Sequence, residues 1–334
     1  MAKQTPSEQL DRIVEAILGP PGASLAGMES AGAFDAEWAP VTSVVAGMRG
    51  LPRADFRARL KADLERRAAM STAPGKAVNY IREGFHSITP YLVIPNAAQL
   101  IEFMKTAFGA EERFRIKGPG TDVIMHAEVK IGDSMVELAE ANTQFPPTPA
   151  SMVLQVDNVD EVYDRAVAAG ATPFQPVADQ DYGERSGTVK DMCGNSWHIS
   201  KPTPGNTIFE RFRSVTPYMN PLRVPAMIEF LRKAFGAEEV YRAQSPDGVV
   251  HHAQVQIGDS VIGMGDAHGP YQPMPCTLHL YVPDADAAYE RAMKAGATSI
   301  QPVADQPYGD RSGGVTDPFG NRWFVATHIR DVAS

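Results

Sequence analysis

Two glutamates and a histidine lie close together around one predicted β-hairpin. His126 and Glu128 precede the dipeptide Gly132–Asp133, and Glu137 follows it. If this dipeptide is a two-residue turn, Glu128 lies opposite Glu137 on the neighbouring strand. Two facing carboxylates repel each other, and in a cavity one of them would keep its proton to a raised pH. Glu137, Glu128 and His126 are therefore our candidates for acid/base catalysis.

The hairpin residues belong to a long internal repeat. The phrase Ser-Ile-Thr-Pro-Tyr at 87–91 returns as Ser-Val-Thr-Pro-Tyr at 214–218, and Ile-Gly-Asp-Ser at 131–134 returns at 257–260. The offset is 126 or 127 residues throughout. A repeat of this length indicates a duplicated domain of about 125 residues and not a solenoid unit.

The two copies differ at the candidate residues. His252 matches His126, whereas Gln254 and Gly263 stand where the first copy has its two glutamates. We therefore expect proton chemistry in the first copy. Structural interpretations stay open: a solvated strand position for Glu137 and a hydrogen-bonded structural histidine for His126.

Each copy reads as two units of one strand, one helix and three strands. In the first copy the expected elements are a strand over 88–94, a helix over 97–107, hairpin strands over 123–131 and 134–139, a strand over 152–156, a helix over 159–169, and closing strands over 187–190 and 196–200. The second copy repeats this order, which predicts an α+β fold. Residues 1–75 differ and have helical periodicity over 7–18 and 54–70. We predict domains at 86–203 and 210–330 behind an N-terminal α-helical segment at 1–75.

Strand alternation predicts which side chains face away from the helices. Residues two apart on a strand share a face. The side chains expected on a concave, ligand-binding side are Thr89, Tyr91, Tyr218, Thr277 and His279. The tyrosines can stack on a planar ligand or fill the interior.

Composition limits the classes of function. The net charge of −9 disfavours a nucleic-acid-binding surface. No apolar run is long enough for a membrane span, and the first residues have no signal-peptide pattern. Two distant cysteines fit a reduced compartment, so we expect a cytoplasmic protein without nucleic-acid or membrane partners.

The repeated phrases resemble the vicinal-oxygen-chelate superfamily, the glyoxalase/bleomycin-resistance/dioxygenase type. The wording is most similar to its PhnB-like branch: Thr-Pro-Tyr at 89–91, His-Ala-Glu at 126–128, and Tyr-Gly-Asp-Arg-Ser-Gly at 308–313 with Asp-Pro-Phe-Gly-Asn-Arg-Trp at 317–323. The similarity covers roughly residues 86–330. It implies a tandem pair of domains with four βαβββ units and curved mixed sheets around concave pockets.

The resemblance also implies positions for metal ligands. They fall on Thr89, Glu137, Ser151 and His198 in the first copy, and on Thr216, Gly263, Thr277 and Phe324 in the second. Of these, Glu137 and His198 have good donor atoms for a divalent metal. Pairing of units within one copy would bring these two together, and pairing across copies would separate them. We expect no standard four-ligand metal centre, with a divalent metal as the open alternative.

Two functions follow as expectations. The first is a protein that binds a small aromatic or amphipathic metabolite or antibiotic, with Phe324 helping to line the pocket. The alternative is a lyase, isomerase or dioxygenase-like enzyme with an atypical metal or acid/base site around Glu137. Because the two copies can pair with each other within one chain, we expect a monomer, with a homodimer as the alternative.

Overall fold

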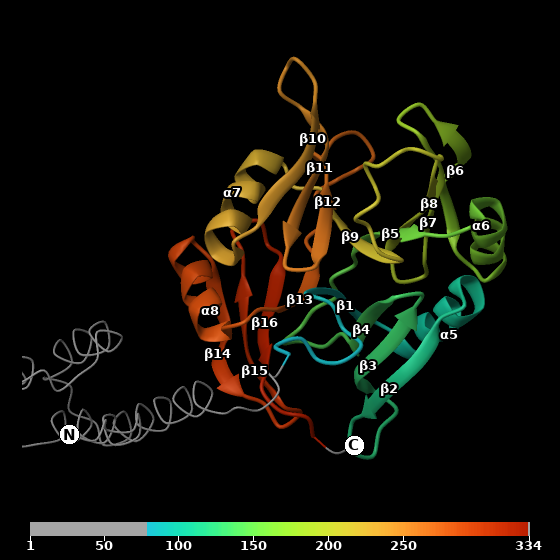
Figure 1. The fold of residues 1–334 in the computed structure, drawn as a ribbon. Helices are drawn as coiled ribbons and strands as arrows, with labels where there is room; N and C mark the ends of the chain where they lie inside the picture. Colours follow the sequence, from blue (N-terminus) through green and yellow to red (C-terminus); the bar gives the residue numbers. More distant parts are fainter. Residues whose placement is uncertain (1–78, 333–334) are drawn as a thin grey trace, which may run out of the picture. The chain divides into compact units, whose positions relative to one another are not determined.

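A computed structural model of the chain describes residues 79–332, all within one compact unit. The predicted helical segment at 1–75 lies outside the described residues. Figure 1 shows the order strand, helix, three strands four times along the chain. The four βαβββ units expected from the sequence are therefore present.

Unit 1 consists of β1 (Ile88–Ile94), α5 (Ala97–Phe108), β2 (Glu111–Lys117), β3 (Ile124–Ile131) and β4 (Ser134–Glu140). Unit 2 consists of β5 (Ser151–Gln155), α6 (Val159–Ala168), β6 (Thr172–Gln180), β7 (Glu184–Lys190) and β8 (Ser196–Pro202). Unit 3 consists of β9 (Val215–Met219), α7 (Val224–Phe235), β10 (Glu238–Gln244), β11 (Val250–Ile257) and β12 (Ser260–Met264). Unit 4 consists of β13 (Thr277–Tyr281), α8 (Ala285–Lys294), β14 (Thr298–Asp305), β15 (Asp310–Thr316) and β16 (Arg322–His328).

The units combine into two mixed sheets of eight strands each. The first sheet has the order β14-β15-β16-β13-β1-β4-β3-β2, so it joins unit 4 to unit 1. The second has the order β10-β11-β12-β9-β5-β8-β7-β6 and joins unit 3 to unit 2. Antiparallel pairing makes both joins, with Thr89 opposite His279 and Val153 opposite Thr216. Each sheet therefore takes one unit from each half of the chain, which answers the pairing question that the sequence left open.

The helices cover one face of each sheet. Strand residues such as Leu92 and Leu138 share a buried apolar core with Leu100 and Met104 of α5. Alternate strand residues point to the opposite side, which we call the helix-free face. Trp197 and Trp323, at matching positions of β8 and β16, are fully buried in the same core.

The hairpin between β3 and β4 has the predicted register. Ile131 pairs with Ser134, and Glu128 pairs with Glu137, so Gly132–Asp133 is a two-residue turn. Gly132 has φ +59°, and a Cβ there would lie 2.1 Å from Ser214 Oγ of the other half. The predicted turn is confirmed, and its glycine also permits a close contact between the halves.

Each hairpin turn forms a hydrogen bond with the residue that precedes the first strand of the other half. Asp133 Oδ1 accepts a hydrogen bond from the Ser214 amide at 2.9 Å, and Asp259 Oδ1 accepts one from the Ser87 amide at 2.8 Å. Arg213 lies between the two carboxylates, 3.3 Å from Asp133 and 3.1 Å from Asp259. We call this group the turn latch. It contributes to holding the two sheets together.

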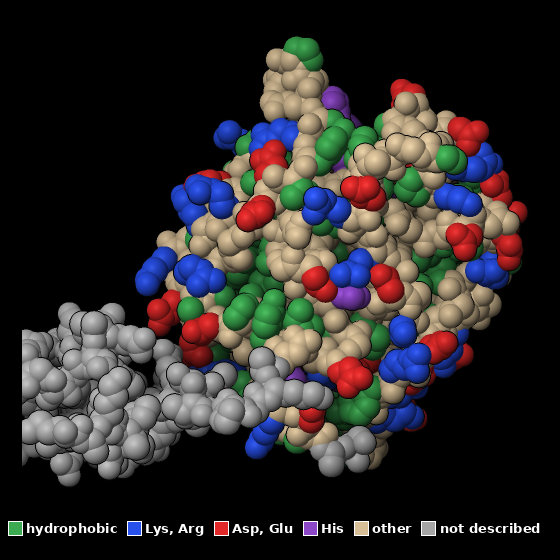
Figure 2. Space-filling model, in the orientation of Figure 1, with side chains coloured by type: hydrophobic (Ala, Val, Ile, Leu, Met, Phe, Trp, Pro, Cys, Tyr) green, Lys and Arg blue, Asp and Glu red, His purple; other side chains and the backbone are tan. Residues whose placement is uncertain are grey.

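The surface carries both signs of charge. Figure 2 shows Lys and Arg side chains interspersed with Asp and Glu over the visible face. Among the described residues, no helix is long and apolar enough to cross a membrane.

The turn latch predicts a loss of stability in acid. Burial acts to raise the pKa of Asp259, but hydrogen bonds from the Ser87 amide and from His86 outweigh it and lower the pKa to about 2. Because this value lies below the ordinary 3.8, the carboxylate stabilises the fold fully above about pH 5 and loses that effect as the pH falls towards 2. We expect Asp259→Asn to lower the free energy of unfolding by about 1 kcal/mol at pH 7, since the side chain is partly exposed. The mutant should also show a flatter decline between pH 5 and 2.

Urea denaturation at several pH values measures this effect. Asp122→Asn is the control, because Asp122 is exposed at a hairpin tip and should change stability by less than about 0.5 kcal/mol. Equal stabilities for the two variants across the pH range would contradict a role for the turn latch.

Candidate functional site

The helix-free face of the first sheet brings together residues from both halves of the chain. Tyr91 and Glu128 both pair with Glu137, on either side of β4. His279 of β13 pairs with Thr89 on one side and with Phe324 of β16 on the other. Eight of the predicted site residues therefore lie on this one sheet: Thr89, Tyr91, His126, Glu128, Glu137, Thr277, His279 and Phe324.

The contact between Glu137 and His279 joins the two halves at the centre of this face. His279 Nδ1 lies 2.9 Å from Glu137 Oε2, and the two residues are 8% and 3% exposed. Burial acts to lower the pKa of His279, but the negative charge and hydrogen bond of Glu137 outweigh it, so the pKa is raised. Glu137 therefore favours the protonated imidazole, the form that can neutralise this buried carboxylate.

Glu128 is neutralised by a residue that precedes β1. Arg82 donates a hydrogen bond to Glu128 Oε1, and His126 Nε2 lies 3.2 Å from the same oxygen. Burial acts to raise the pKa of Glu128, but these hydrogen bonds and the Arg82 charge lower it overall. The expectation that one of the two facing carboxyls has a raised pKa therefore does not apply to Glu128, whose partners His126 and Arg82 lower its pKa.

His126 occupies the space between the two glutamates and Tyr91. Its Nδ1 lies 3.2 Å from the Tyr91 hydroxyl, and its Nε2 lies 3.9 Å from Glu137 Oε1. In the second sheet Tyr218 and His252 repeat the tyrosine–histidine contact at 3.2 Å, with Gln254 and Gly263 at the positions of Glu128 and Glu137. The recurrence favours a structural part for the pair, and the glutamates are what distinguish the first sheet.

Aromatic and apolar side chains surround the polar group. The rings of Tyr91 and Phe324 are 5.7 Å apart, and that of Phe145 lies 6.3 Å from Phe324. Phe114 on β2 lies 6.2 Å from His126 and is 41% exposed. Exposed apolar groups beside a buried polar cluster are typical of a ligand-binding surface.

The donor atoms decide which metal site the chain could form. With units paired across the halves, the four family positions on the first sheet are Thr89, Glu137, Thr277 and Phe324, and Glu137 is the sole strong donor among them. The usual four-position set therefore does not fit. A different set has suitable types and spacing, because ligand atoms of His126, Glu128 and Glu137 all lie within 4.8 Å of one another.

His198 lies on the other sheet and cannot join Glu137 in one site. In the second sheet its Nε2 lies 2.6 Å from Glu184 Oε1, and its Nδ1 lies 3.0 Å from Thr188 Oγ1. Of the two pairings left open by the sequence, the structure has the one that separates Glu137 from His198, because β4 and β8 belong to different sheets.

The helix-free face of the second sheet is filled where the first is charged. A Cβ on Gly263 would lie 2.6 Å from the ring of Tyr218, so the ring occupies the space that Glu137 takes in the first sheet. Burial lowers the pKa of His252 to about 4, which leaves it neutral near pH 7. Tyr218, a predicted ligand-binding residue, therefore lies away from the other candidates.

Sequence reasoning missed several charged residues of the first sheet. Asp310 accepts a hydrogen bond from the Tyr281 hydroxyl at 2.7 Å and lies 2.7 Å from His328 Nδ1. Arg82 had a signal in the repeat, since Asn79-Tyr-Ile-Arg82 matches Asn206-Thr-Ile-Phe209 at the same offset of 127. Extending the repeat upstream of residue 86 would have found it.

Comparisons with known proteins agree with this architecture. The family model described as the Glyoxalase/Bleomycin resistance protein/Dioxygenase superfamily matches residues 84–199 and 222–325. An uncharacterized protein of Mycobacterium tuberculosis is 35% identical over 134 residues, which cover 36% of this chain and 79% of the relative. A Mycobacterium bovis relative has the same identity, with 88% of its length covered. The chain belongs to this superfamily.

Solved structures support the fold. Glyoxalase I from Zea mays has a TM-score of 0.55 at 13% identity, over 72% of this chain and 92% of that one. A point mutant of the same enzyme has a TM-score of 0.56 at 14% identity, over the same shares. At this identity the likeness shows the shared fold alone.

The Glu137–His279 contact predicts the titration of one histidine. In Glu137→Gln the negative charge is lost while burial remains, so we expect the pKa of His279 to fall. NMR of histidine-labelled protein measures this. Glu184→Gln is the matched control, because Glu184 contacts His198 on the second sheet and should leave His279 unchanged. An unaltered His279 titration in Glu137→Gln would refute the contact.

Proposed function

We propose that the protein binds a small aromatic or amphipathic molecule on the helix-free face of the first sheet. The observation that carries this proposal is the combination of a buried, charge-neutralised polar group with an aromatic rim. Glu137 and His279 form the floor, and Tyr91 and Phe324 lie beside it. Such a surface matches the usual ligand site, in which apolar walls supply affinity and a few polar groups fix orientation.

The buried polar atoms support a ligand with hydrogen-bonding groups. Thr277 Oγ1 is fully buried and has no hydrogen-bond partner among the described residues. Thr277 lies on β13 two residues before His279, so both side chains face the same side. Thr89 pairs with His279 across the join of the halves. A ligand with a hydroxyl or carbonyl group would find partners on this floor.

An acid/base or metal-dependent enzyme is the second candidate. It is favoured by the close grouping of His126, Glu128 and Glu137, whose donor types suit a divalent ion. A bound ion would act as a Lewis acid. Against it, the Arg82 guanidinium already contacts Glu128, and three of the four family ligand positions lack strong donors.

We also infer that the chain arose by tandem duplication of a PhnB-like domain and that it is a monomer. The repeated phrases and the two matches to one family model support duplication. Pairing of units across the halves within one chain supports the monomer, with the homodimer as the alternative. Light scattering distinguishes these oligomeric states.

A fragment screen tests ligand binding at the proposed face. In saturation-transfer NMR with a set of small aromatic compounds, we expect binders whose affinity falls at least tenfold in Phe324→Ala, since the ring lines the proposed pocket. His198→Ala is the matched control at the corresponding position of the second sheet and should bind normally. Binders that are insensitive to both Phe324→Ala and Tyr91→Ala would rule this face out.

Native mass spectrometry of protein purified without added metal separates the two candidates. A stoichiometric Zn, Ni, Mn or Fe ion that is lost in Glu137→Ala would favour the enzyme. A small molecule that is recovered unchanged would favour binding.

A further inference from the structure

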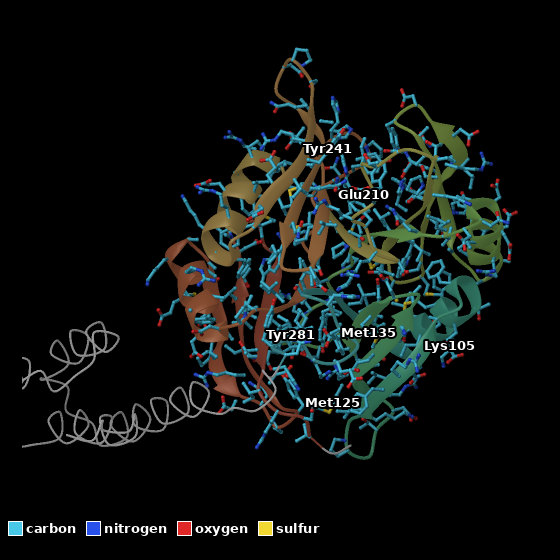
Figure 3. The ribbon with its side chains drawn as sticks, viewed as in Figure 1. Lys105, Met125, Met135, Glu210, Tyr241 and Tyr281 are labelled. Carbon is cyan, nitrogen blue, oxygen red and sulfur yellow. The ribbon has the colours of Figure 1, made fainter. Side chains whose placement is uncertain are left out.

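A short segment before β1 lies across the helix-free face of the first sheet. We call residues 79–86 the first strap. The Tyr80 carbonyl accepts a hydrogen bond from the His328 amide at 2.9 Å, and the Phe85 ring meets Tyr281 edge-on at 6.0 Å. Phe85 also packs with Met135 and Tyr281, both labelled in Figure 3. The first strap therefore covers part of the proposed ligand site.

Arg82 connects the first strap to the charged floor. Its guanidinium lies 4.1 Å from the Phe85 ring centroid and contacts Glu128. The Arg82 side chain is 25% exposed, whereas the Glu128 side chain is 8% exposed. The carboxylate is thus fixed in a core strand, and its positive partner stands on a peripheral segment.

A second strap, residues 206–213, occupies the matching place on the second sheet and is held differently. Phe209 and Phe212 pack against Val153 and Val261 in an apolar cluster. The Ile208 carbonyl accepts a hydrogen bond from Gln254 at 2.8 Å. Around Phe209, apolar packing and a neutral hydrogen bond therefore hold the second strap, and its ion contacts in the described structure are made by Arg213 at the turn latch. The buried Glu184 of this sheet is paired with His198 and not with a strap residue.

The contrast between the straps identifies what Arg82 does. Where the sheet carries glutamates the strap carries arginine, and where the sheet carries Gln254 and Gly263 the strap carries Phe209. Buried carboxylates without a positive partner are costly, so Arg82 supplies the cation that the first sheet needs. Another cation in the same place would make Arg82 unnecessary there.

We propose that a cationic group entering the first helix-free face takes the place of Arg82 at Glu128 and frees the first strap. This inference rests on the proposed ligand site and deepens it by naming the charge of the ligand. Glu137 Oε1 has no hydrogen-bond partner among the described residues, and His126 Nε2 lies 3.9 Å from it, while His279 Nδ1 contacts the other oxygen, Oε2. The entering group meets this oxygen as well as Glu128.

Two kinds of ligand share this chemistry. A divalent ion would use the donor atoms of His126, Glu128 and Glu137. An organic ammonium would donate hydrogen bonds to the carboxylates and place its aromatic part on Tyr91 and Phe324. The probes are therefore ZnCl2, benzylammonium chloride and the neutral analogue benzyl alcohol.

Hydrogen–deuterium exchange of the full-length protein reports release of the strap. We expect faster exchange in peptides covering residues 79–86 with ZnCl2 or with benzylammonium, and unchanged exchange over residues 206–213. Benzyl alcohol should leave both straps unchanged. If ZnCl2 increases the exchange, the cation is a divalent metal ion, and if benzylammonium does, it is an organic ammonium.

Calorimetry on two variants tests the competition. Arg82→Gln removes the built-in cation, so it should bind the active cationic probe at least tenfold more tightly than the natural chain. Arg211→Gln on the second strap is the matched control, because the Arg211 guanidinium donates a hydrogen bond to the neutral Gln256 at 2.7 Å, and it should not alter affinity.

The outcomes separate this inference from the proposed function. Cation binding with unchanged exchange at residues 79–86, or unchanged affinity in Arg82→Gln, overturns the strap mechanism. If neither ZnCl2 nor benzylammonium binds to Arg82→Gln, the proposal that the ligand is a cation is wrong. In either case, binding of neutral aromatic compounds that depends on Phe324 would leave the proposed function standing.

Discussion

The antiparallel joins of β1 with β13 and of β5 with β9 determine which residues can act together. Each join continues one sheet from one half of the chain into the other, so each helix-free face combines two distant units. Glu137 meets His279 for this reason, although the two are 142 residues apart. His198, which is closer to Glu137 in the sequence, meets Glu184 on the other sheet. The turn latch around Asp133 and Asp259 binds the same two halves from their hairpin turns.

Charge compensation gives the two faces different characters. The first face buries two carboxylates at neighbouring strand positions, with Arg82 in contact with Glu128 and His279 in contact with Glu137. The second face has Gln254 and Gly263 at these two positions, and Tyr218 and Phe212 fill the space beside Gly263. Removing one partner from a buried charged pair costs several kcal/mol, whereas replacing the whole set with apolar groups can be nearly neutral. The first face keeps its carboxylates together with their partners, and the second face replaces both glutamates with uncharged residues.

Local patterns predicted most of the fold, and pairing between distant strands decided the rest. The Gly132–Asp133 turn fixed the register that places Glu128 opposite Glu137, and alternation placed Tyr91 and His279 on the helix-free face. Local sequence patterns could not predict that unit 1 pairs with unit 4. Pairing within one copy and pairing across copies need the same alternation of side chains, and they differ only in which half of the chain supplies the strand beside β1. The lowered pKa of Glu128 was missed for a similar reason, since its partner Arg82 stands 46 residues earlier in a segment without strand or helix periodicity.

A double-mutant cycle on the free energy of unfolding tests the joining of the halves most directly. The cycle combines Glu137→Gln with His279→Gln, and a second cycle combines Glu137→Gln with His198→Gln. We expect a coupling energy of about 1 kcal/mol or more for Glu137 with His279, because the two are in contact in a buried site. Coupling below about 0.5 kcal/mol is expected for Glu137 with His198, which lie on different sheets. Strong coupling in the second cycle and none in the first would contradict a site built from both halves of the chain.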